Sequence, residues 1–246
     1  MKITATIVTL DEEASLPRAL ASLEFCDEVL VVDSGSTDRT VQLAENSGAR
    51  VIAQPWPGFS AQKNFAAEQA SNDWILALDA DEQVTEELRE EIAGARFESH
   101  AGFSFPRKAR YLSRWILHSG WYPDRKVRLY DRRHAPWVGD YVHESVEVDG
   151  AVGRLHGDLR HHTCDSFGEH ISTLNRYTTL AAEEHCSLGR RVGWGNLLMS
   201  PVWAFFKSYL VKRGFLDGIQ GLLIAHAAAF YVFAKYAKAR MMQQAE

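Results

Sequence analysis

The sequence has few of the residues that mark disulfide-stabilised, metal-finger or disordered chains. Its three cysteines, Cys26, Cys164 and Cys186, lie far apart and form no Cys-x-x-Cys pair, which argues against a disulfide framework and favours a reducing compartment. Seven prolines and 17 glycines among 246 residues, with 46% hydrophobic side chains, exclude long disordered tracts. No internal repeat is present, which excludes a solenoid. The length allows one large α/β domain, alone or with an appended segment.

The first residues lack a recognisable targeting signal. Residues 2–8 are typical of a strand, with neither the long apolar core nor the small-residue cleavage site of a signal peptide. We therefore expect a cytoplasmic protein.

The net charge of −5 hides an uneven distribution along the chain. Residues 1–106 carry 7 Lys and Arg against 19 Asp and Glu, and residues 134–189 carry 3 against 9. Residues 107–133 carry 9 basic side chains against 2 acidic ones, and residues 190–246 carry 8 against 2. The two basic blocks suit phosphate groups or an anionic membrane surface. They lack the basic helix and the aromatic-basic pattern of nucleic-acid-binding modules, so we expect no nucleic acid partner.

Strand and helix patterns alternate over the first hundred residues. Apolar runs predict strands at residues 3–9, 29–32, 51–52 and 74–78, and helical patterns fall at residues 14–23, 37–46, 60–70 and 85–95. This alternation predicts an α/β fold with a mostly parallel sheet, whose ligands bind at the carboxyl ends of the strands. Beyond it we expect strands at residues 102–106, 127–130, 145–148 and 156–162, a helix over residues 167–188, and apolar helices from residue 194 onward.

Two carboxylates follow one of the buried strands. Asp79 and Asp81 stand one residue apart after residues 74–78, where a turn would let both reach one ion. Carboxylate, phosphate and water oxygens are the ligands that Mg²⁺ and Mn²⁺ prefer. The alternative is an acidic turn before the helix that starts near Thr85, because Asp-x-Asp tripeptides are common.

Other polar side chains are predicted at the same edge of the sheet. Asp33 ends the second strand and can accept hydrogen bonds from a nucleobase or a ribose, whereas the residues after it read as helix caps. Thr9 and Asp11 follow the first strand. Lys63 and Asn64 lie on the helix that precedes the two carboxylates, where the ammonium group could offset phosphate charge. A solvent-exposed lysine is the alternative.

In this order and spacing, the motifs TLDEE, VDSGSTD, QKN and LDAD resemble those of family 2 glycosyltransferases with the GT-A fold, over about residues 1–150. The resemblance implies an inverting, metal-dependent transferase that uses a nucleotide diphosphate donor. It implies a nucleotide pocket and a metal site formed by Thr9, Asp11, Asp33, Lys63, Asn64, Asp79 and Asp81. Within this set Asp79 and Asp81 face the diphosphate and the metal, with Asp81 as the direct ligand. Asp11 departs from the pattern, because relatives usually carry Asn there.

An inverting transferase needs a general base that deprotonates the acceptor hydroxyl. Residues 137–145 combine aromatic side chains suited to a sugar-binding floor with a glycine and two acids. Their His-Glu pair resembles the position that supplies the base in this branch of the family, which indicates Glu144, with Asp140 as the alternative. A solvent-exposed acid on a strand edge is the remaining interpretation.

Residues 122–130 resemble the branch of bacterial lipopolysaccharide core β-1,4-glucosyltransferases. Arg125, Lys126 and Arg128 are candidates for binding the acceptor or a phosphate, and the last two, as alternate residues, would share one strand face. A solvated face is the alternative. His161, with His162 as the alternative, is a candidate metal ligand, because GT-A relatives often place a histidine near the metal or the diphosphate. The spacing of its neighbours excludes a zinc finger.

The last fifty residues raise the question of membrane contact. Residues 218–234 contain no Asp, Glu, Lys or Arg, but they include Gln220 and His226 and are short and polar for a bilayer span. Basic residues on both sides fit helices that lie in the headgroup layer. The alternative is helices that pack on the catalytic domain or on a second subunit of a homodimer.

The sequence thus predicts a GT-A catalytic domain over residues 1–165 and a helical C-terminal segment over residues 166–246. By resemblance, we expect transfer of glucose from a UDP-sugar to a hydroxyl of a lipid-linked glycan such as lipopolysaccharide core, at the inner face of the cell membrane. Two alternatives stay open, namely a polyprenyl-phosphate sugar synthase and an inactive sugar-nucleotide-binding scaffold. A nucleotidyltransferase is disfavoured, because residues 9–13 contain no glycine.

Overall fold

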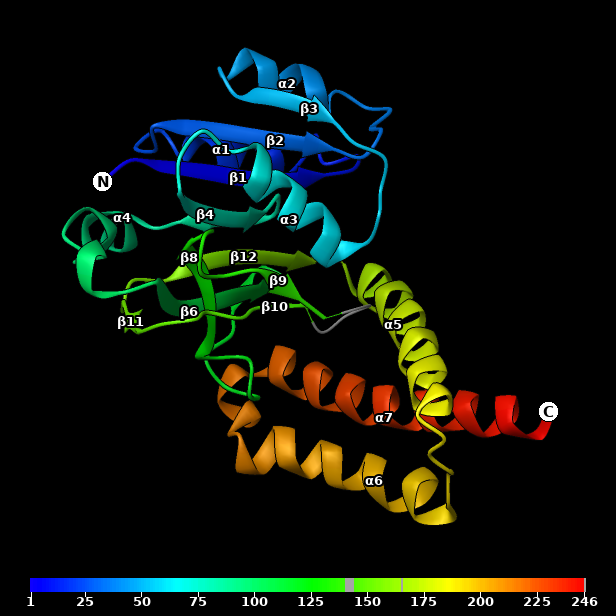
Figure 1. Cartoon of the computed structure of the whole chain (residues 1–246). Helices are drawn as coiled ribbons and strands as arrows, with labels where there is room; N and C mark the ends of the chain where they lie inside the picture. Colours follow the sequence, from blue (N-terminus) through cyan, green and yellow to red (C-terminus); the bar gives the residue numbers. More distant parts are fainter. Residues whose placement is uncertain (140–143, 165, 246) are drawn as a thin grey trace. The chain divides into compact units, whose positions relative to one another are not determined.

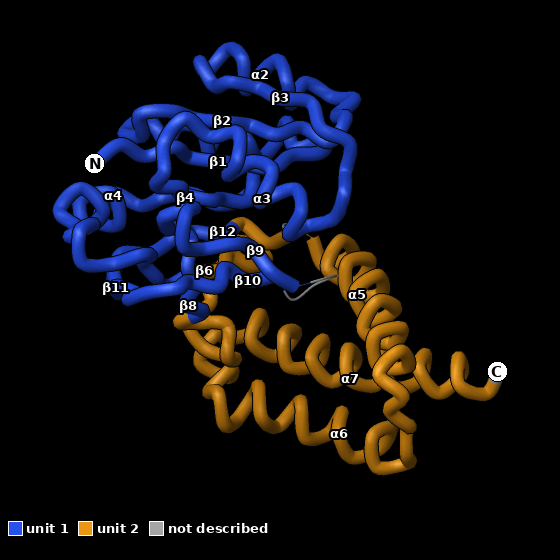
Figure 2. Tube along the Cα trace, viewed as in Figure 1, with its two compact units in different colours: residues 1–107, 124–161 blue, residues 108–123, 162–246 orange. Residues whose placement is uncertain are grey.

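The computed structural model describes residues 1–139, 144–164 and 166–245 and divides the chain into two compact units (Figures 1 and 2). Unit 1 comprises Met1–Arg107 and Asp124–His161, and unit 2 comprises Lys108–Pro123 and His162–Glu246. Residues 108–123 therefore group with the C-terminal helices, although the sequence-based division placed them before the boundary at residue 165. That division, as a statement about separate domains, stays a prediction.

Four parallel strands form the first half of the sheet of unit 1. Their order is β3 (Arg50–Ala53), β2 (Glu28–Asp33), β1 (Ile3–Thr9) and β4 (Trp74–Asp79). The order reverses at β1, because β2 and β3 extend to one side of it and β4 lies on the other. Such a reversal opens a crevice at the carboxyl ends of the strands. Thr9 pairs with Asp33 and Val8 pairs with Asp79, so the polar ends of all three strands lie at one edge.

Successive side chains of these strands point to opposite faces of the sheet, and helices pack against both faces. Trp74, Leu76 and Leu78 share a buried cluster with side chains of α1 (Leu16–Ala21) and α4 (Glu86–Ala93). Ile75 and Ala77, which point to the other face, pack with Ala67 of α3 (Phe59–Gln69). The helix α2 (Thr40–Asn46) lies beside β3 at the end of the sheet, and a single 3₁₀ turn, η1 (Phe97–Ser99), follows α4 (Figure 1).

The second half of the sheet is mixed. After β4 come β8 (Asp124–Asp131), β6 (Gly102–Tyr111), β12 (Leu159–Cys164) and β5 (Glu82–Val84), while β7 (Arg114–Trp115) and β11 (Val152–Arg154) pair with β6. β8 runs antiparallel to both β4 and β6. A separate two-stranded ladder joins β9 (Trp137–Val138) to β10 (Ser145–Val146).

Most predicted elements are present. The helices α1, α2 and α4 are shorter than expected, whereas the strands β2, β6 and β8 extend beyond their predicted ranges. The helix predicted from Thr85 is confirmed, because the Thr85 hydroxyl accepts a hydrogen bond from the backbone N–H of Leu88. The helix predicted over residues 37–46 begins only at Thr40. Its expected caps are used differently, since Ser36 hydrogen-bonds to Asp33 and Thr37 to the Asp11 side chain.

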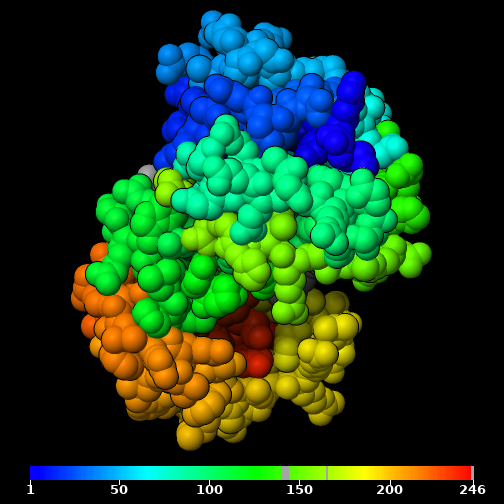
Figure 3. All heavy atoms as spheres, turned by 90° about the vertical axis from the view of Figure 1, so that its left-hand side faces the viewer, coloured from blue at the N-terminus to red at the C-terminus, as the bar shows by residue number. Residues whose placement is uncertain are grey.

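Unit 2 contains the C-terminal helices. They are α5 (Phe167–Ser187), α6 (Trp194–Phe206), a π-helical turn η2 (Lys207–Val211), a 3₁₀ turn η3 (Gly214–Asp217) and α7 (Ile219–Ala245). α7 contacts both α5 and α6, and it is visible in dark red at the back of a depression between yellow and orange segments of this unit (Figure 3). The helical character predicted after residue 194 is confirmed.

The apolar side chains of unit 2 are unevenly buried. α6 has no buried residue, and Trp194, Met199 and Trp203 each expose more than 60% of their surface. α7 satisfies the length and composition of a membrane-crossing helix over Ile219–Gln244, with only 22% of the tested window buried. The folded helix meets that length because it continues past the uncharged stretch through Lys235 and Lys238. Core helices of globular proteins also meet this criterion.

Candidate active site

The β2 end of the edge is built around Asp33, whose carboxylate is held by neutral donors. It accepts hydrogen bonds from the hydroxyl of Thr9 at 3.0 Å and from the backbone N–H groups of Gly35 and Ser36 at 2.9 and 2.8 Å. The Ser36 hydroxyl donates a further short bond. Burial would raise the pKa of Asp33, but these hydrogen bonds lower it. Thr9 and Asp33 therefore lie side by side as predicted, and Asp33 also organises the turn after β2.

Asp11 holds the next part of the same loop. Its backbone has a φ of 54°, a left-handed conformation that Asp adopts more readily than most residues. Its carboxylate accepts bonds from the N–H of Thr37 at 2.7 Å and of Asp38 at 3.3 Å. The Asp38 carboxylate in turn accepts from the N–H of Thr40, the first residue of α2. Asp11 thus joins the loops after β1 and β2, in addition to any contact it makes with a nucleotide.

A second, charged network surrounds the end of β4. The Asp79 carboxylate lies 2.9 Å from the ammonium group of Lys63 and 2.6 Å from the guanidinium of Arg128. Arg128 also contacts Glu82, whose carboxylate is fully buried, at 3.1 Å. Burial would raise the pKa of Asp79, but Arg128 and Lys63 hold it well below its usual range. The same carboxylates raise the pKa of Arg128 above its usual range despite its burial.

Lys63 extends this network to the predicted base. Its ammonium group lies 3.4 Å from a carboxylate oxygen of Glu144 and 4.4 Å from the ring centroid of Trp137. Asn64 fixes the strand that carries this ring, because its side-chain amide exchanges two 2.9 Å hydrogen bonds with the backbone of Trp137. The structure thus brings Lys63, Asp79 and Glu144 together. Asp140, the alternative base, lies outside the described residues.

Asp81 has a different partner. Its carboxylate lies 3.0 Å from Nε2 of His161 on β12. Burial would lower the pKa of His161, but the hydrogen bond to Asp81 raises it. Burial and the nearby charge of Asp81 raise the pKa of Glu12.

Asp81 and His161 are suited to be the protein ligands of a divalent metal ion. Within the described ranges, no three His, Cys, Asp or Glu side chains converge as a complete set of ligands. Asp81 and His161 offer one oxygen and one nitrogen, and Mg²⁺ commonly takes only one or two carboxylates from the protein and fills its remaining positions with phosphate and water. Asp79 is less suited to direct ligation, because Lys63 and Arg128 already neutralise it.

The three basic residues of β8 meet three different environments. The Arg125 guanidinium donates two hydrogen bonds to the carbonyl of Leu155, and Lys126 pairs with Asp124 with 44% of its side chain exposed. Only Arg128, 5% exposed, reaches the carboxylates of the edge. The shared strand face predicted for Lys126 and Arg128 is interrupted by a bulge. Phe103 pairs with Leu129 and Ser104 with Val127, which leaves Arg128 as the extra residue.

Two features of the site were not predicted, namely the role of Glu82 and the contacts of Trp137 with the basic side chains. Glu82 accepts a hydrogen bond from the N–H of Asp79 at 3.0 Å, binds Arg128 and contacts Arg107 at 3.4 Å. Its position directly after the Asp-Ala-Asp motif was the available signal. The Trp137 ring also contacts Arg128, with 5.4 Å between the guanidinium carbon and the ring centroid. No sequence signal connects Trp137 to these cations, because the contact depends on the fold.

Comparisons with known sequences identify the family of the chain. The family model described as Glycosyl transferase family 2 matches residues 4–144. An uncharacterised glycosyltransferase of Rickettsia felis is 35% identical over 97% of this chain and 89% of its own length. The lipopolysaccharide core biosynthesis glycosyltransferase LpsC of Rhizobium meliloti is 32% identical over 97% of this chain and 92% of its own. The resemblance inferred from the motifs is thereby confirmed.

Two solved structures share the fold at low sequence identity. S. aureus TarS 1-349 in complex with UDP-GlcNAc has a TM-score of 0.51 and 16% identity, covering 100% of this chain and 93% of its own. Glucosyl-3-phosphoglycerate synthase from Mycobacterium tuberculosis in complex with Mn²⁺ and UDP-glucose has a TM-score of 0.52 and 17% identity, covering 80% and 82%. The predicted α/β fold of the GT-A class, with its C-terminal helices, is confirmed.

Proposed function

Since the chain belongs to glycosyl transferase family 2, we propose that it transfers glucose from a UDP-sugar to a hydroxyl of a lipid-linked glycan, with inversion at the anomeric carbon. The relative LpsC, named for lipopolysaccharide core biosynthesis, supports an acceptor of the lipopolysaccharide core type.

One observation carries the proposal, namely the ion-pair chain from Asp79 through Lys63 to Glu144. The distances of 2.9 and 3.4 Å bring a carboxylate from the loop before β10 to the end of β4, where the crevice of the sheet opens. Glu144 and Asp79 both pair with Lys63. A general base held this close to a strand-end carboxylate suits a reaction in which an acceptor hydroxyl attacks a sugar diphosphate. The buried Arg128 fixes Asp79 from the other side.

The reaction proposed is a single displacement. Glu144 takes the proton of the acceptor hydroxyl as its oxygen forms a bond to the anomeric carbon of the donor, and the bond from that carbon to the phosphate oxygen breaks, releasing UDP. Thr9 and Asp33 lie where the nucleoside would bind, and Asp33 can accept from a base or a ribose hydroxyl while it holds its turn. Asp81 and His161 would hold Mg²⁺ or Mn²⁺ together with the diphosphate, and the bound metal would neutralise charge that develops on the leaving group.

A donor and acceptor panel tests the function. UDP-glucose and three other UDP-sugars are offered with Mg²⁺ or Mn²⁺ to truncated, deacylated core acceptors and, separately, to polyprenyl phosphate, with the linkage read by NMR. Glycosidic linkage to a core hydroxyl supports the proposal. A phosphodiester-linked sugar would show a polyprenyl-phosphate sugar synthase, and binding of UDP without any transfer would show an inactive scaffold.

We also propose that the protein attaches peripherally to the inner face of the cell membrane. The exposed apolar side chains of α6 support attachment, and so do the ammonium groups of Lys207 and Lys212, which bind none of the described residues. Two other basic residues contribute less than their charge suggests. Lys238 donates to the carbonyl of Asn175 at 2.8 Å, and Arg240 donates to the carbonyl of Val192 at 2.9 Å.

Flotation with anionic liposomes tests this attachment. The protein should float with vesicles rich in phosphatidylglycerol and be partly released by salt, because screening weakens only the electrostatic part of binding. A protein that stays wholly in the soluble fraction would support the competing interpretation, in which these helices form a dimer contact or an internal layer.

A further inference from the structure

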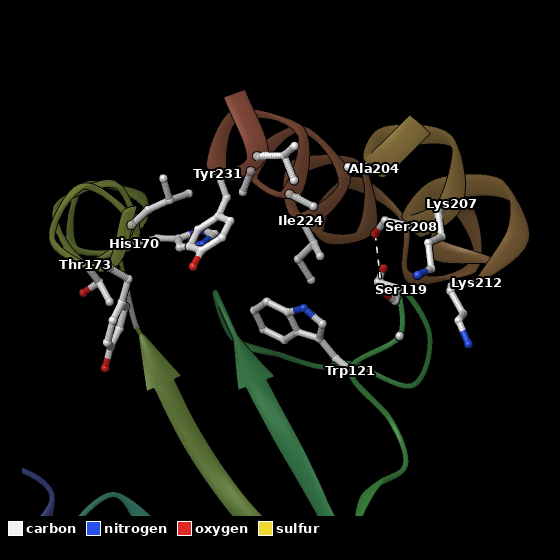
Figure 4. A pocket seen from close by; sticks show the side chains of 16 residues that line it. Ser119, Trp121, His170, Thr173, Ala204, Lys207, Ser208, Lys212, Ile224 and Tyr231 are labelled. Atoms are coloured by element: carbon white, nitrogen blue, oxygen red, sulfur yellow. Dashed lines mark hydrogen bonds between the residues drawn. The ribbon is translucent and has the colours of Figure 1, made fainter. Parts of the chain in front are cut away.

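The helices of unit 2 line an open cavity, and none of the residues of the proposed active site contributes to its wall. Its volume is about 550 Å³, and its walls come from α5, from α6 and η2, from α7 and from the loop that contains Ser119 (Figure 4). This volume lies within the range of roughly 300–1,000 Å³ that is typical of small-molecule sites. All of its lining residues belong to unit 2.

Most of the cavity wall is hydrocarbon. Leu174 of α5, together with Ile224 and Val232 of α7, lines it, and Figure 4 shows the rings of Trp121 and Tyr231 on either side of the Ile224 side chain. Such a wall favours an apolar ligand, because each methylene group moved from water into it contributes about 0.8 kcal/mol.

The two lysines of the lining lie at one side of the cavity. Lys207 and Lys212 lie together there, across the cavity from His170 and Thr173 (Figure 4). Neither ammonium group forms an ion pair or a hydrogen bond with any of the described residues. An anion is the complementary partner for two adjacent uncompensated lysines.

A buried hydroxyl on the same side also lacks a partner. Ser119 is only 7% exposed and lines the cavity, yet its Oγ has no hydrogen-bond partner among the described residues. Its backbone is firmly held, because its N–H donates to the carbonyl of Lys212 at 2.9 Å and its carbonyl accepts from Ser208 Oγ at 3.3 Å. The turn therefore places a buried hydroxyl that has no partner among the described residues beside the backbone of Lys212, and such a group calls for an explanation, of which a bound ligand is one.

The surroundings of the two lysines indicate where the ligand comes from. Phe206, Leu210 and Val211, which flank them along η2, expose 46%, 51% and 61% of their surface. Cations among exposed apolar side chains are typical of a surface that lies in the headgroup layer of a bilayer. A soluble anion would find the lysines there but would leave the hydrocarbon wall unused.

We propose that this cavity binds one hydrocarbon chain of a membrane phospholipid, with the phosphate of that lipid on Lys207 and Lys212 and within reach of the Ser119 hydroxyl. The inference rests on the proposed membrane attachment, and it does not depend on the transfer reaction. It makes the lipid a specific ligand of unit 2, in addition to the general attraction of basic residues to an anionic surface.

Calorimetric titration of the full chain with dodecyl phosphate below its micelle concentration tests the proposal. Saturable binding of one molecule per chain is expected, with a negative heat-capacity change from apolar burial. The uncharged dodecyl ether of octaethylene glycol should bind at least roughly tenfold more weakly, and inorganic phosphate should not bind measurably.

Three variants locate the binding. Ala228→Phe fills the cavity from a half-buried position and should abolish binding of both dodecyl compounds. The double variant Lys207→Gln, Lys212→Gln should weaken the binding of dodecyl phosphate at least roughly tenfold and leave the binding of the ether unchanged. Lys235→Gln, a charge removal on α7 outside the cavity lining, is the matched control and should change neither. Circular dichroism confirms folding, and Ala204→Phe replaces Ala228→Phe if the latter unfolds.

Binding of dodecyl phosphate that survives both the filling variant and the double lysine variant would overturn the proposal, as would the absence of saturable binding. Transfer to a deacylated acceptor is measured with the same proteins and should be unchanged in all of them. If the protein binds dodecyl phosphate but transfers no sugar, the proposed activity is wrong and the lipid site stands. If it transfers sugar but does not bind dodecyl phosphate, the lipid site is wrong and the proposed activity stands.

Discussion

The two halves of the active-site edge stabilise carboxylates in different ways. At the ends of β1 and β2, Asp11 and Asp33 accept hydrogen bonds from backbone N–H groups and hydroxyls close by in the loops. At the end of β4, Asp79 is held by two cations, Lys63 of α3 and Arg128 of β8. The hydrogen bonds to Asp11 and Asp33 fix the conformation of the loops. The ion pairs of Asp79 belong to a buried network of charged side chains. The second half is therefore where single substitutions should have the largest effects.

The largest expected effect is on stability, from Arg128→Met. The substitution removes one of the two ion pairs of Asp79 among the described residues and leaves the buried Glu82 with the more distant Arg107. Removing one partner of a buried ion pair costs about 3–5 kcal/mol. Urea unfolding measures it. Lys126→Met, two residues away on the same strand but exposed, should cost no more than about 1 kcal/mol. Equal losses in the two variants would mean that the bulge does not bury Arg128.

The next effect is on metal-dependent donor binding, from Asp81→Asn. The amide keeps the shape of the side chain but is a poor ligand for a hard cation, so transfer should fall by on the order of 10³-fold. UDP titration with and without Mn²⁺ should show that binding no longer depends on the metal. Asp38→Ala, which removes an acceptor from the first N–H of α2, should instead cost about 1 kcal/mol of stability and keep metal-dependent binding. Metal-dependent UDP binding that persists in Asp81→Asn would remove Asp81 from the metal site.

A smaller kinetic effect is expected from Glu144→Gln. Donor binding and folding should stay normal, while kcat falls at least about a hundredfold, because the amide keeps the shape and loses the basicity. Asp140→Asn is the comparison. A loss of only a few-fold in Glu144→Gln, together with an inactive Asp140→Asn, would assign the base to Asp140.

The smallest effect concerns Glu28 at the opposite end of β2. Its carboxylate is bound both by neutral hydrogen-bond donors and by a cation, Arg50. Partial burial would raise its pKa, but hydrogen bonds from Ser71, Thr4 and Arg50 lower it to about 2. Because the pKa is depressed in the folded state, the stabilisation is present above the unfolded pKa near 4.5 and is lost as pH falls toward 2.

Unfolding of Glu28→Gln from pH 7 to pH 2 tests this assignment. The variant should be less stable by on the order of 1 kcal/mol at pH 7, and the difference from the wild type should vanish toward pH 2. Glu86→Gln, which changes an exposed carboxylate, is the matched control and should follow the wild type. A difference that persists at pH 2 would mean that Glu28 acts through packing.

Much of the fold was predictable because its signals are local. The strands β1, β2 and β4 are short apolar runs, and the order of strands and helices implied a sheet whose polar strand ends meet at one edge. Thr9, Asp33 and Asp79 therefore could be placed together from sequence. The start of α2 could not be predicted to the residue, since Ser36 and Thr37 bond to Asp33 and Asp11 in preference to capping the helix.

The partners of these residues were set by long-range structure. His161 meets Asp81 because β12 runs antiparallel to β5, and strand pairing across that separation has no local signal. The alternation rule placed Lys126 and Arg128 on one face, and a single extra residue in β8 separated them. Asn64, whose expected place near the nucleotide stays a prediction, holds the backbone of Trp137 through two hydrogen bonds.

By itself the sequence determined the strand–helix order, the family and the edge on which the acidic residues lie, because hydrophobic period and turn chemistry act over a few residues. The tertiary structure decided that Lys63 and Arg128 neutralise Asp79, that Asp81 pairs with His161, and that Lys207 and Lys212 bind none of the described residues beside an apolar cavity. Charge compensation and cavity shape depend on groups that are remote in sequence and meet only when strands and helices pack, so no local pattern could encode them.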